Sequence, residues 1–154
     1  MTTRGIYVLR NGGIEHEVLT YRYVKMGARI AADALNLPHE IVLKSLVFRA
    51  IGGSFLFALI GADASVSTRK LGRVTGHKHV EAAAPRDAEH VTGYRVGGIS
   101  PLGSRHELPV VLDDRTAEHP ALVINAGARG TLVRLAAADL IRVLNASIAD
   151  VRAG

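Results

Sequence analysis

Lys44 lies inside an otherwise apolar stretch of the sequence, where a charged side chain is unusual. The stretch runs from Ile41 to Phe48 and reads IVLKSLVF. Side chains of a strand alternate between two faces, so Val42, Lys44 and Leu46 would share one face. A lysine in this position either protects a sheet edge from aggregation or places its own positive charge at a pocket. The residues by themselves favour edge protection and leave the pocket role open.

The segment 92–103, TGYRVGGISPLG, contains four glycines and one proline. Gly97 and Gly98 can expose backbone N–H groups that no side chain covers. Such N–H groups can hold a carbonyl oxygen, an oxyanion or a phosphate. The spacing does not match a P-loop, because no GKS or GKT follows the glycines. A double turn with a purely structural role is the alternative interpretation.

Other common catalytic patterns are missing from the sequence. The seven histidines include His77 and His79, but no HExxH motif and no third ligand are evident, so we expect surface or structural histidines. There is no G-x-S-x-G motif to indicate a serine nucleophile. The chain has no cysteine, which excludes disulfides, thiolate zinc sites and a cysteine nucleophile. We therefore expect neither a metal ion nor a cofactor.

The chain is basic, with 19 Lys and Arg against 14 Asp and Glu, a net charge of +5. A basic balance favours a polyanionic partner, because binding phosphates releases counterions. Aromatic residues make up only 5%, which argues against a surface that stacks nucleobases. A cluster of basic residues could contact a nucleic-acid backbone: Arg69, Lys70, Arg73, Lys78 and Arg105. A solvated helix face is the alternative explanation for this cluster.

Helical and strand patterns alternate irregularly along the chain. The segment 3–10 fits a helix or a strand, and Ser67 is a candidate N-cap of a helix that ends before Gly76. The runs VVL and LVI are typical of strands buried on both faces. We expect helices at 28–36, 67–73, 85–91 and 137–145, and strands at 15–23, 41–50, 55–62, 108–112, 122–125 and 132–135. Gly52 and Gly53 favour a hairpin between the second and third strands.

These patterns predict an α+β fold with a central mixed sheet. The length of 154 residues and the absence of a linker indicate a single domain, 1–154. The first ten residues lack the apolar region of a signal peptide, and the longest apolar run, 54–62, is too short to cross a bilayer. With no cysteine in the chain, a cytoplasmic location is expected.

Several segments carry a family resemblance in the same order along the chain. They are VLKSL at 42–46, RKL at 69–71, KHVE at 78–81, TGYRVGGISPLG at 92–103, AGARG at 126–130 and LAAADL at 135–140. Together they resemble the YbaK/ProX-like aminoacyl-tRNA deacylases, especially the Cys-tRNA(Pro) deacylase branch. The resemblance covers almost the whole chain, and the glycine-rich segment is its most specific part.

The resemblance implies a barrel-like mixed sheet flanked by helices, and a pocket beside the GGISP segment. It implies deacylation of misacylated tRNA in trans, most of all Cys-tRNA(Pro), with prolyl-tRNA synthetase as a possible source of tRNA identity. The family lysine falls on Lys44, which reverses the preference for edge protection. Lys44 would position the aminoacyl group or stabilise charge on the ester carbonyl. The expected substrate-binding residues are Tyr21, Ser45, Gly97, Gly98, Ile99, Ser100, Pro101 and Asn125.

For a cysteinyl ester, the resemblance implies that the substrate's own thiol attacks the ester carbonyl, whereas water would attack an alanyl ester. Four features depart from the family pattern: Ser45 replaces a threonine, Asn125 a serine and Leu132 an aspartate, and the segment 23–28 is short, with Met26 in place of an aromatic residue. Three alternatives therefore stay open: an Ala-tRNA(Pro) deacylase, a non-catalytic module that binds tRNA or a synthetase, and an enzyme acting on another small ester.

Overall fold

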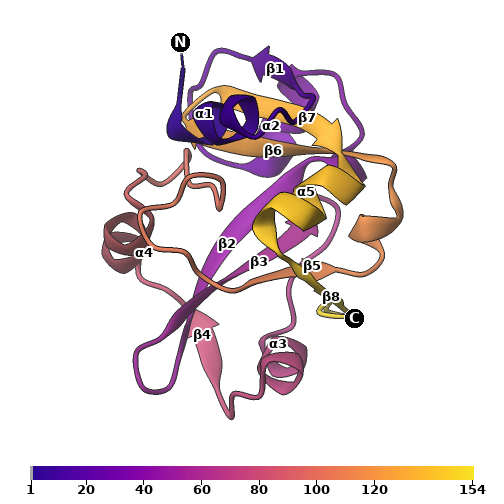
Figure 1. The fold of residues 1–154 in the computed structure, drawn as a ribbon. Helices are drawn as coiled ribbons and strands as arrows, with labels where there is room; N and C mark the ends of the chain where they lie inside the picture. Colours follow the sequence, from indigo (N-terminus) through magenta and orange to yellow (C-terminus); the bar gives the residue numbers. More distant parts are fainter. Residues whose placement is uncertain (1) are drawn as a thin grey trace.

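The computed structural model describes residues 2–154, so the predicted domain is seen from its second residue onward. Its strands form two sheets, a smaller one drawn above a larger one in Figure 1. The smaller sheet is antiparallel, in the order β1 (Glu17–Thr20), β7 (Thr131–Ala136) and β6 (Ala121–Ala128). An isolated parallel bridge between Val42 and Val123 joins it to the larger sheet.

The larger sheet is mixed, as expected from the sequence. Its central hairpin of β2 and β3 is antiparallel, whereas β3 with β5 and β5 with β8 are parallel pairs. In spatial order its strands are β4 (Val80–Ala82), β2 (Leu43–Ala50), β3 (Phe55–Gly61), β5 (Val110–Asp113) and β8 (Ser147–Ala149).

The helices flank these sheets, and two of them begin at polar caps. The Thr3 hydroxyl accepts a hydrogen bond from the Ile6 amide at 3.1 Å, which settles the ambiguous segment 3–10 as a helix. The Ser67 hydroxyl accepts one from the Lys70 amide at 3.2 Å, so the predicted N-cap is confirmed. The α-helices are α1 (Arg4–Asn11), α2 (Ala28–Ala34), α3 (Thr68–Thr75), α4 (Pro85–Thr92) and α5 (Ala137–Leu144); η1 (His39–Ile41) and η2 (Thr116–Glu118) are short 3₁₀ turns.

The main core lies between the two sheets and beneath α1 and α5. It contains Ile6, Leu59, Ile124 and Leu140, all fully buried. A second cluster packs Leu71 of α3 against the other face of the larger sheet. The runs at 110–112 and 122–124 are buried throughout, as their sequences predict. No helix within residues 2–154 is long and apolar enough to cross a membrane.

The α+β class and the mixed sheet are confirmed, but the described strands do not close into a barrel. Instead the strands split into two sheets, because β6, β7 and β1 pair only with each other apart from one bridge. The expectation of a single barrel-like sheet is corrected in this respect.

Strand β2 keeps part of one edge unpaired. The Ala50 N–H donates to the Ser54 carbonyl at 2.8 Å, so Ala50 and every second residue before it face β3. The residues between them face the opposite edge, where the Ala83 N–H donates to the Val47 carbonyl at 3.0 Å. Strand β4 pairs only with the last three residues of β2. Within residues 2–154, Ser45 therefore lies on an edge that no strand covers.

Candidate active site

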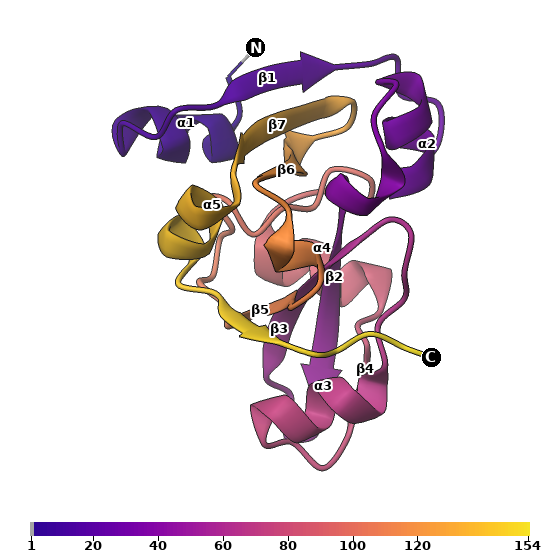
Figure 2. The same cartoon turned by 90° about the vertical axis from the view of Figure 1, so that its right-hand side faces the viewer.

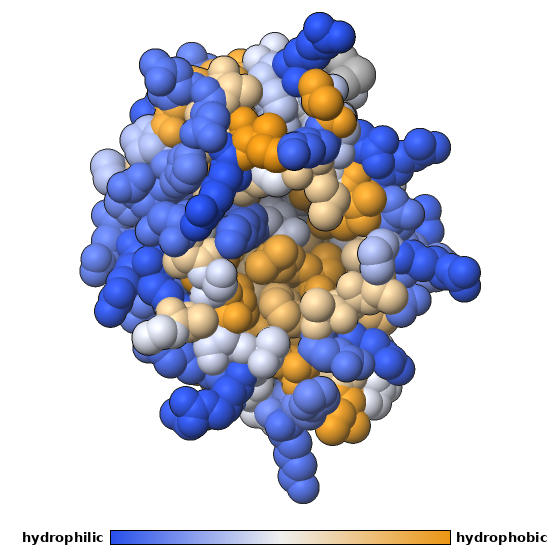
Figure 3. All heavy atoms as spheres, turned by 180° about the vertical axis from the view of Figure 1, so that it is seen from behind, coloured by the Kyte–Doolittle hydropathy of each residue, from blue (hydrophilic) through white to orange (hydrophobic). Residues whose placement is uncertain are grey.

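A pocket of about 460 Å³ opens beside this free edge. Side chains of β2 and α2 line it together with the glycine-rich segment and the residues around α4. Figure 3 shows this face of the molecule, where hydrophobic side chains gather in a hollow and hydrophilic ones surround it. The polar side chains in the lining are Tyr21, Lys44, Ser45 and Asn125, and no Asp or Glu of the described chain is among them.

Lys44 lies at the wall of this pocket and is partly buried. Its ammonium donates a hydrogen bond to the Ala64 carbonyl at 2.5 Å. Burial lowers the pKa of Lys44, the nearby positive charge of Arg29 lowers it further, and Asp63 opposes them. Arg29 itself is anchored through Nε to the Ala62 carbonyl at 2.8 Å. The structure thus places Lys44 where its ammonium group can contact a molecule bound in the pocket.

Ser45 contributes a polar group without a protein partner. Its Oγ is buried and makes no hydrogen bond within the described residues. A buried hydroxyl without a partner costs free energy. The backbone N–H and C=O of Ser45 face the same open edge of β2. The backbone of Ser45 therefore offers a bound molecule one donor and one acceptor.

The glycine-rich segment enters the pocket through a tight turn. The Gly98 N–H donates to the Arg95 carbonyl at 2.8 Å, and Gly97 at the third position has a φ of 88°. A Cβ on Gly97 would lie 2.5 Å from Oη of Tyr23, so glycine is required there for space as well. The Gly98 amide is thus already engaged within the turn. Within residues 2–154 the Gly97 N–H makes no hydrogen bond and is the freer donor.

Asn125 braces this turn from the neighbouring strand β6. Its Nδ2 donates to the Gly97 carbonyl at 3.1 Å, and its Oδ1 accepts from the Gly127 N–H at 2.7 Å. These bonds lie at a register shift of β6 between Asn125 and Ala128. Asn125 lines the pocket as expected, but its amide is occupied in holding the loop.

The remaining predicted substrate-binding residues divide into two groups. Tyr21 and Ile99 line the pocket, and burial, followed by the neighbouring Tyr23, raises the pKa of Tyr21. Ser100 and Pro101 are buried and do not line it. The Ser100 hydroxyl accepts from the Leu102 amide at 3.1 Å, so this residue shapes the loop. Pro101 borders a separate, smaller cavity.

The two apolar replacements also take part in the pocket. Leu132, where the resembling family has an aspartate, is 3% exposed and lines the pocket wall. Met26 is 59% exposed and also lines the pocket. An incoming amino group therefore meets no carboxylate in the pocket wall.

None of the basic residues predicted to contact tRNA lines the pocket. No residue of α3 lines it, and α3 and α2 lie at opposite ends of the molecule in both Figure 1 and Figure 2. The Lys70 ammonium is bound to Asp150 at 3.0 Å and to the Arg152 carbonyl at 2.7 Å. Arg105 donates through Nη1 to the His90 carbonyl at 3.1 Å. The other candidates, Arg69, Arg73 and Lys78, are exposed.

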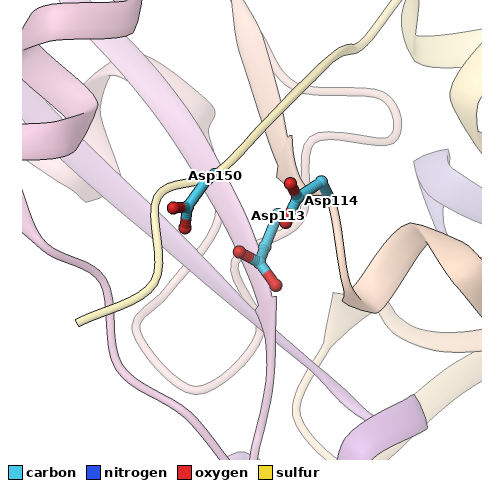
Figure 4. Close-up of side chains that lie close together, drawn as sticks. All are labelled: Asp113, Asp114 and Asp150. Carbon is cyan, nitrogen blue, oxygen red and sulfur yellow. The ribbon is translucent and has the colours of Figure 1, made fainter. Parts of the chain in front are cut away.

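Three aspartates that sequence reasoning did not single out lie together near the C-terminus: Asp113, Asp114 and Asp150 (Figure 4). Asp113 is fully buried and accepts from Nη2 of Arg152 at 2.9 Å. Asp150 is paired with Lys70. Two of the three carboxylates thus already have basic partners, and the cluster fastens the C-terminal segment to β5.

Comparison with known proteins identifies the family. The aminoacyl-tRNA editing domain matches residues 26–143, a stretch that includes the free edge of β2, the braced turn and most of the pocket lining. The chain therefore belongs to the aminoacyl-tRNA editing domain family. The family expected from the sequence, a deacylase family of translation quality control, is confirmed.

Two relatives resemble the chain over most of its length. One, EbsC of Enterococcus faecalis, is named as a candidate Cys-tRNA(Pro)/Cys-tRNA(Cys) deacylase; it is 28% identical over 82% of this chain and 77% of its own length. A proline–tRNA ligase of Trichlorobacter lovleyi is 31% identical over 76% of this chain, which matches 21% of the ligase. The chain thus corresponds to one part of the ligase.

Solved structures share the fold. A candidate trans-editing enzyme for prolyl-tRNA synthetase superimposes with a TM-score of 0.87 at 24% identity, covering 100% of this chain and 99% of that one. The hypothetical protein APE2540 gives a TM-score of 0.89 at 19% identity, covering 98% and 100%. At sequence identities this low, the similarity to these structures establishes a shared fold only.

Proposed function

We propose that this protein is a deacylase that acts in trans on misacylated tRNA, most of all Cys-tRNA(Pro), with Ala-tRNA(Pro) as the alternative substrate. The observation that carries the proposal is the meeting of the Lys44 ammonium and the braced Gly97 turn at one apolar pocket. The family membership and the relatives named above support it.

The pocket suits an ester that is already activated. The Ser45 hydroxyl has no basic partner that would make it a nucleophile. The Lys44 ammonium and the Gly97 N–H can instead stabilise negative charge as it develops on the ester carbonyl oxygen. Apolar walls lower the local dielectric and strengthen both interactions. Holding the reacting groups in place contributes further to the rate.

The attacking group would depend on the amino acid. With a cysteinyl ester, the substrate sulfur forms a bond to the carbonyl carbon, the bond to the ribose oxygen breaks, and that oxygen takes the thiol proton. With an alanyl ester, water attacks, releasing alanine and the free ribose hydroxyl. The pocket supplies orientation and charge stabilisation in both reactions.

Recognition of the tRNA would be shared with a partner. The pocket can hold the aminoacyl end, and we propose that prolyl-tRNA synthetase, acting in the same cytoplasm, supplies tRNA(Pro). A non-catalytic binding module is the second candidate, and the apolar Leu132 in the pocket wall is the observation that favours it.

The test is deacylation of Cys-tRNA(Pro) and Ala-tRNA(Pro) by the wild type, Lys44→Ala and Lys44→Arg, each corrected for spontaneous ester hydrolysis. We expect the wild type to clear one ester and Lys44→Ala to lose about 100-fold in rate. Lys44→Arg keeps the charge but changes its shape, and should retain part of the activity. A wild type that binds tRNA but clears neither ester would support the binding module.

A further inference from the structure

We propose that a basic rim around the pocket mouth binds the phosphates at the acceptor end of the tRNA, and that α3 does not. The rim consists of Arg22, Lys25, Arg29, Arg95 and Arg129. This inference rests on the proposed function, because it takes the aminoacyl ester to lie in the pocket.

Each rim residue adjoins the pocket lining. Four of them are direct chain neighbours of lining residues: Arg22 of Tyr21, Lys25 of Met26, Arg29 of Ala28 and Arg95 of Val96. The fifth, Arg129, donates through Nε to the Val96 carbonyl at 3.0 Å. All five side chains are exposed. Three segments far apart in the sequence thus place basic residues next to the lining of one pocket, where Arg29 lies close enough to Lys44 to lower its pKa and Arg129 is bound to Val96.

The rim segments carry no acidic residue of their own. The stretches 21–29, 94–99 and 125–130 contain no Asp or Glu. Two carboxylates close to the site have partners of their own: Glu89 accepts from the Val96 N–H at 2.9 Å, and Asp63, which also acts on Lys44, lies 3.5 Å from Arg152. An excess of positive charge around an apolar opening focuses the electrostatic field there, and this favours a polyanion.

Two rim arginines are held in a form suited to phosphate. Arg29 and Arg129 each use Nε to bind a backbone carbonyl, of Ala62 and Val96 respectively. Their terminal Nη groups have no recorded partner within the described chain, so both can point at an anion. Arg129 is further steadied over the Tyr23 ring, with its guanidinium carbon 5.4 Å from the ring centre. A guanidinium fixed at one end can donate two parallel hydrogen bonds to phosphate at little entropic cost.

The basic residues of α3 fit this role less well. Lys70 is bound to Asp150 and Arg152, and the helix lies at the far end of the molecule from α2. In a tRNA the last phosphate joins the esterified adenosine to the preceding nucleotide. With the ester in the pocket, this phosphate therefore lies near the pocket mouth.

The experiment compares Arg29→Gln/Arg129→Gln with the competing variant Arg69→Gln/Arg73→Gln. The deacylation substrates are aminoacyl-tRNA(Pro) and 2′(3′)-O-aminoacyl adenosine, which carries the ester but no phosphate. We expect the rim variant to lose about tenfold in kcat/KM on the tRNA ester relative to its loss on the adenosine ester. This comparison also corrects for any effect of Arg29 on Lys44, because both substrates use the same pocket.

Binding of uncharged tRNA(Pro), followed by fluorescence anisotropy at several salt concentrations, tests the rim even if no ester is cleaved. The slope of log binding constant against log salt concentration measures the number of phosphate contacts. Removing two such contacts should reduce the magnitude of this slope by about 1.5–2 in the rim variant. The Arg69→Gln/Arg73→Gln protein should keep the wild-type slope. A reduced slope in the α3 variant with a wild-type slope in the rim variant would overturn the proposal. Thermal melting checks that both variants are folded.

Discussion

At the residue scale, the charge of Lys44 depends on its neighbours. Burial and Arg29 lower the pKa of Lys44, whereas Asp63 raises it. If the ammonium is the active form, activity is complete below this pKa and is lost as the pH rises through it. The alkaline limb of the pH profile should therefore fall at a lower pH than the pKa of an ordinary lysine.

Substituting these neighbours should move the alkaline limb in opposite directions. Arg29→Gln removes a positive charge, raises the pKa of Lys44 and shifts the limb to higher pH. Asp63→Asn removes a negative charge and shifts it to lower pH. The measurement is kcat/KM against pH on the aminoacyl adenosine ester, after subtraction of enzyme-free hydrolysis. Unchanged limbs in both variants would show that Lys44 does not act as an ammonium.

Asn125 is the second residue whose role can be isolated. Asn125→Ala removes two hydrogen bonds that fix Gly97 and Gly127, and we expect the free energy of unfolding to fall by about 1–3 kcal/mol. Because Gly97 is then less firmly placed, kcat should fall more than KM changes. Urea unfolding and steady-state kinetics measure the two effects. A wild-type kcat in a destabilised protein would limit Asn125 to a structural role.

At the element scale, the glycine loop packs directly on the backbone of β6. A Cβ on Gly98 would lie 3.0 Å from the carbonyl carbon of Ala128 and from the Arg129 nitrogen. Gly98→Ala should therefore push the loop away, cost about 1–3 kcal/mol of stability and reduce activity. Gly12→Ala, at the end of α1, is the matched control, since its nearest contact is 3.3 Å. Equal effects of the two changes, measured by thermal melting and deacylation, would argue against this packing.

Local sequence signals predicted most of the elements. Ser67 marked the start of α3, and Gly52 and Gly53 marked the hairpin of β2 and β3. Strands β4 and β8 were missed because each has three residues, too few for an alternating pattern to show. The division into two sheets was missed as well, since strand pairing is decided by contacts distant in the sequence.

At the scale of the whole molecule, the C-terminal segment is tied to the sheet by a buried ion pair. Asp113 is 0% exposed and its partner Arg152 is 18% exposed. Arg152→Ala leaves the Asp113 carboxylate without a countercharge, and we expect it to cost about 3–5 kcal/mol in urea unfolding. The double variant Asp113→Asn/Arg152→Ala should recover part of this loss, because no charge stays buried. A double variant as unstable as the single one would contradict this interpretation.

The site itself was only partly predictable. Lys44, Tyr21 and Gly97 were expected from their motifs and meet in the pocket. Arg29 and Arg129 were missed because they come close to the lining residues Lys44 and Val96 only through tertiary packing. The segment 21–29 contains basic residues and no Asp or Glu, and this was the sequence feature that could have indicated Arg29.

The most direct test of the central claim is single-turnover cleavage of Cys-tRNA(Pro) with enzyme in excess, comparing wild type with Lys44→Ala. We predict rapid loss of the ester with the wild type and a rate about 100-fold lower with the variant. Equal rates for the two proteins, or a wild type no faster than buffer, would contradict the assignment of Lys44 to the reaction.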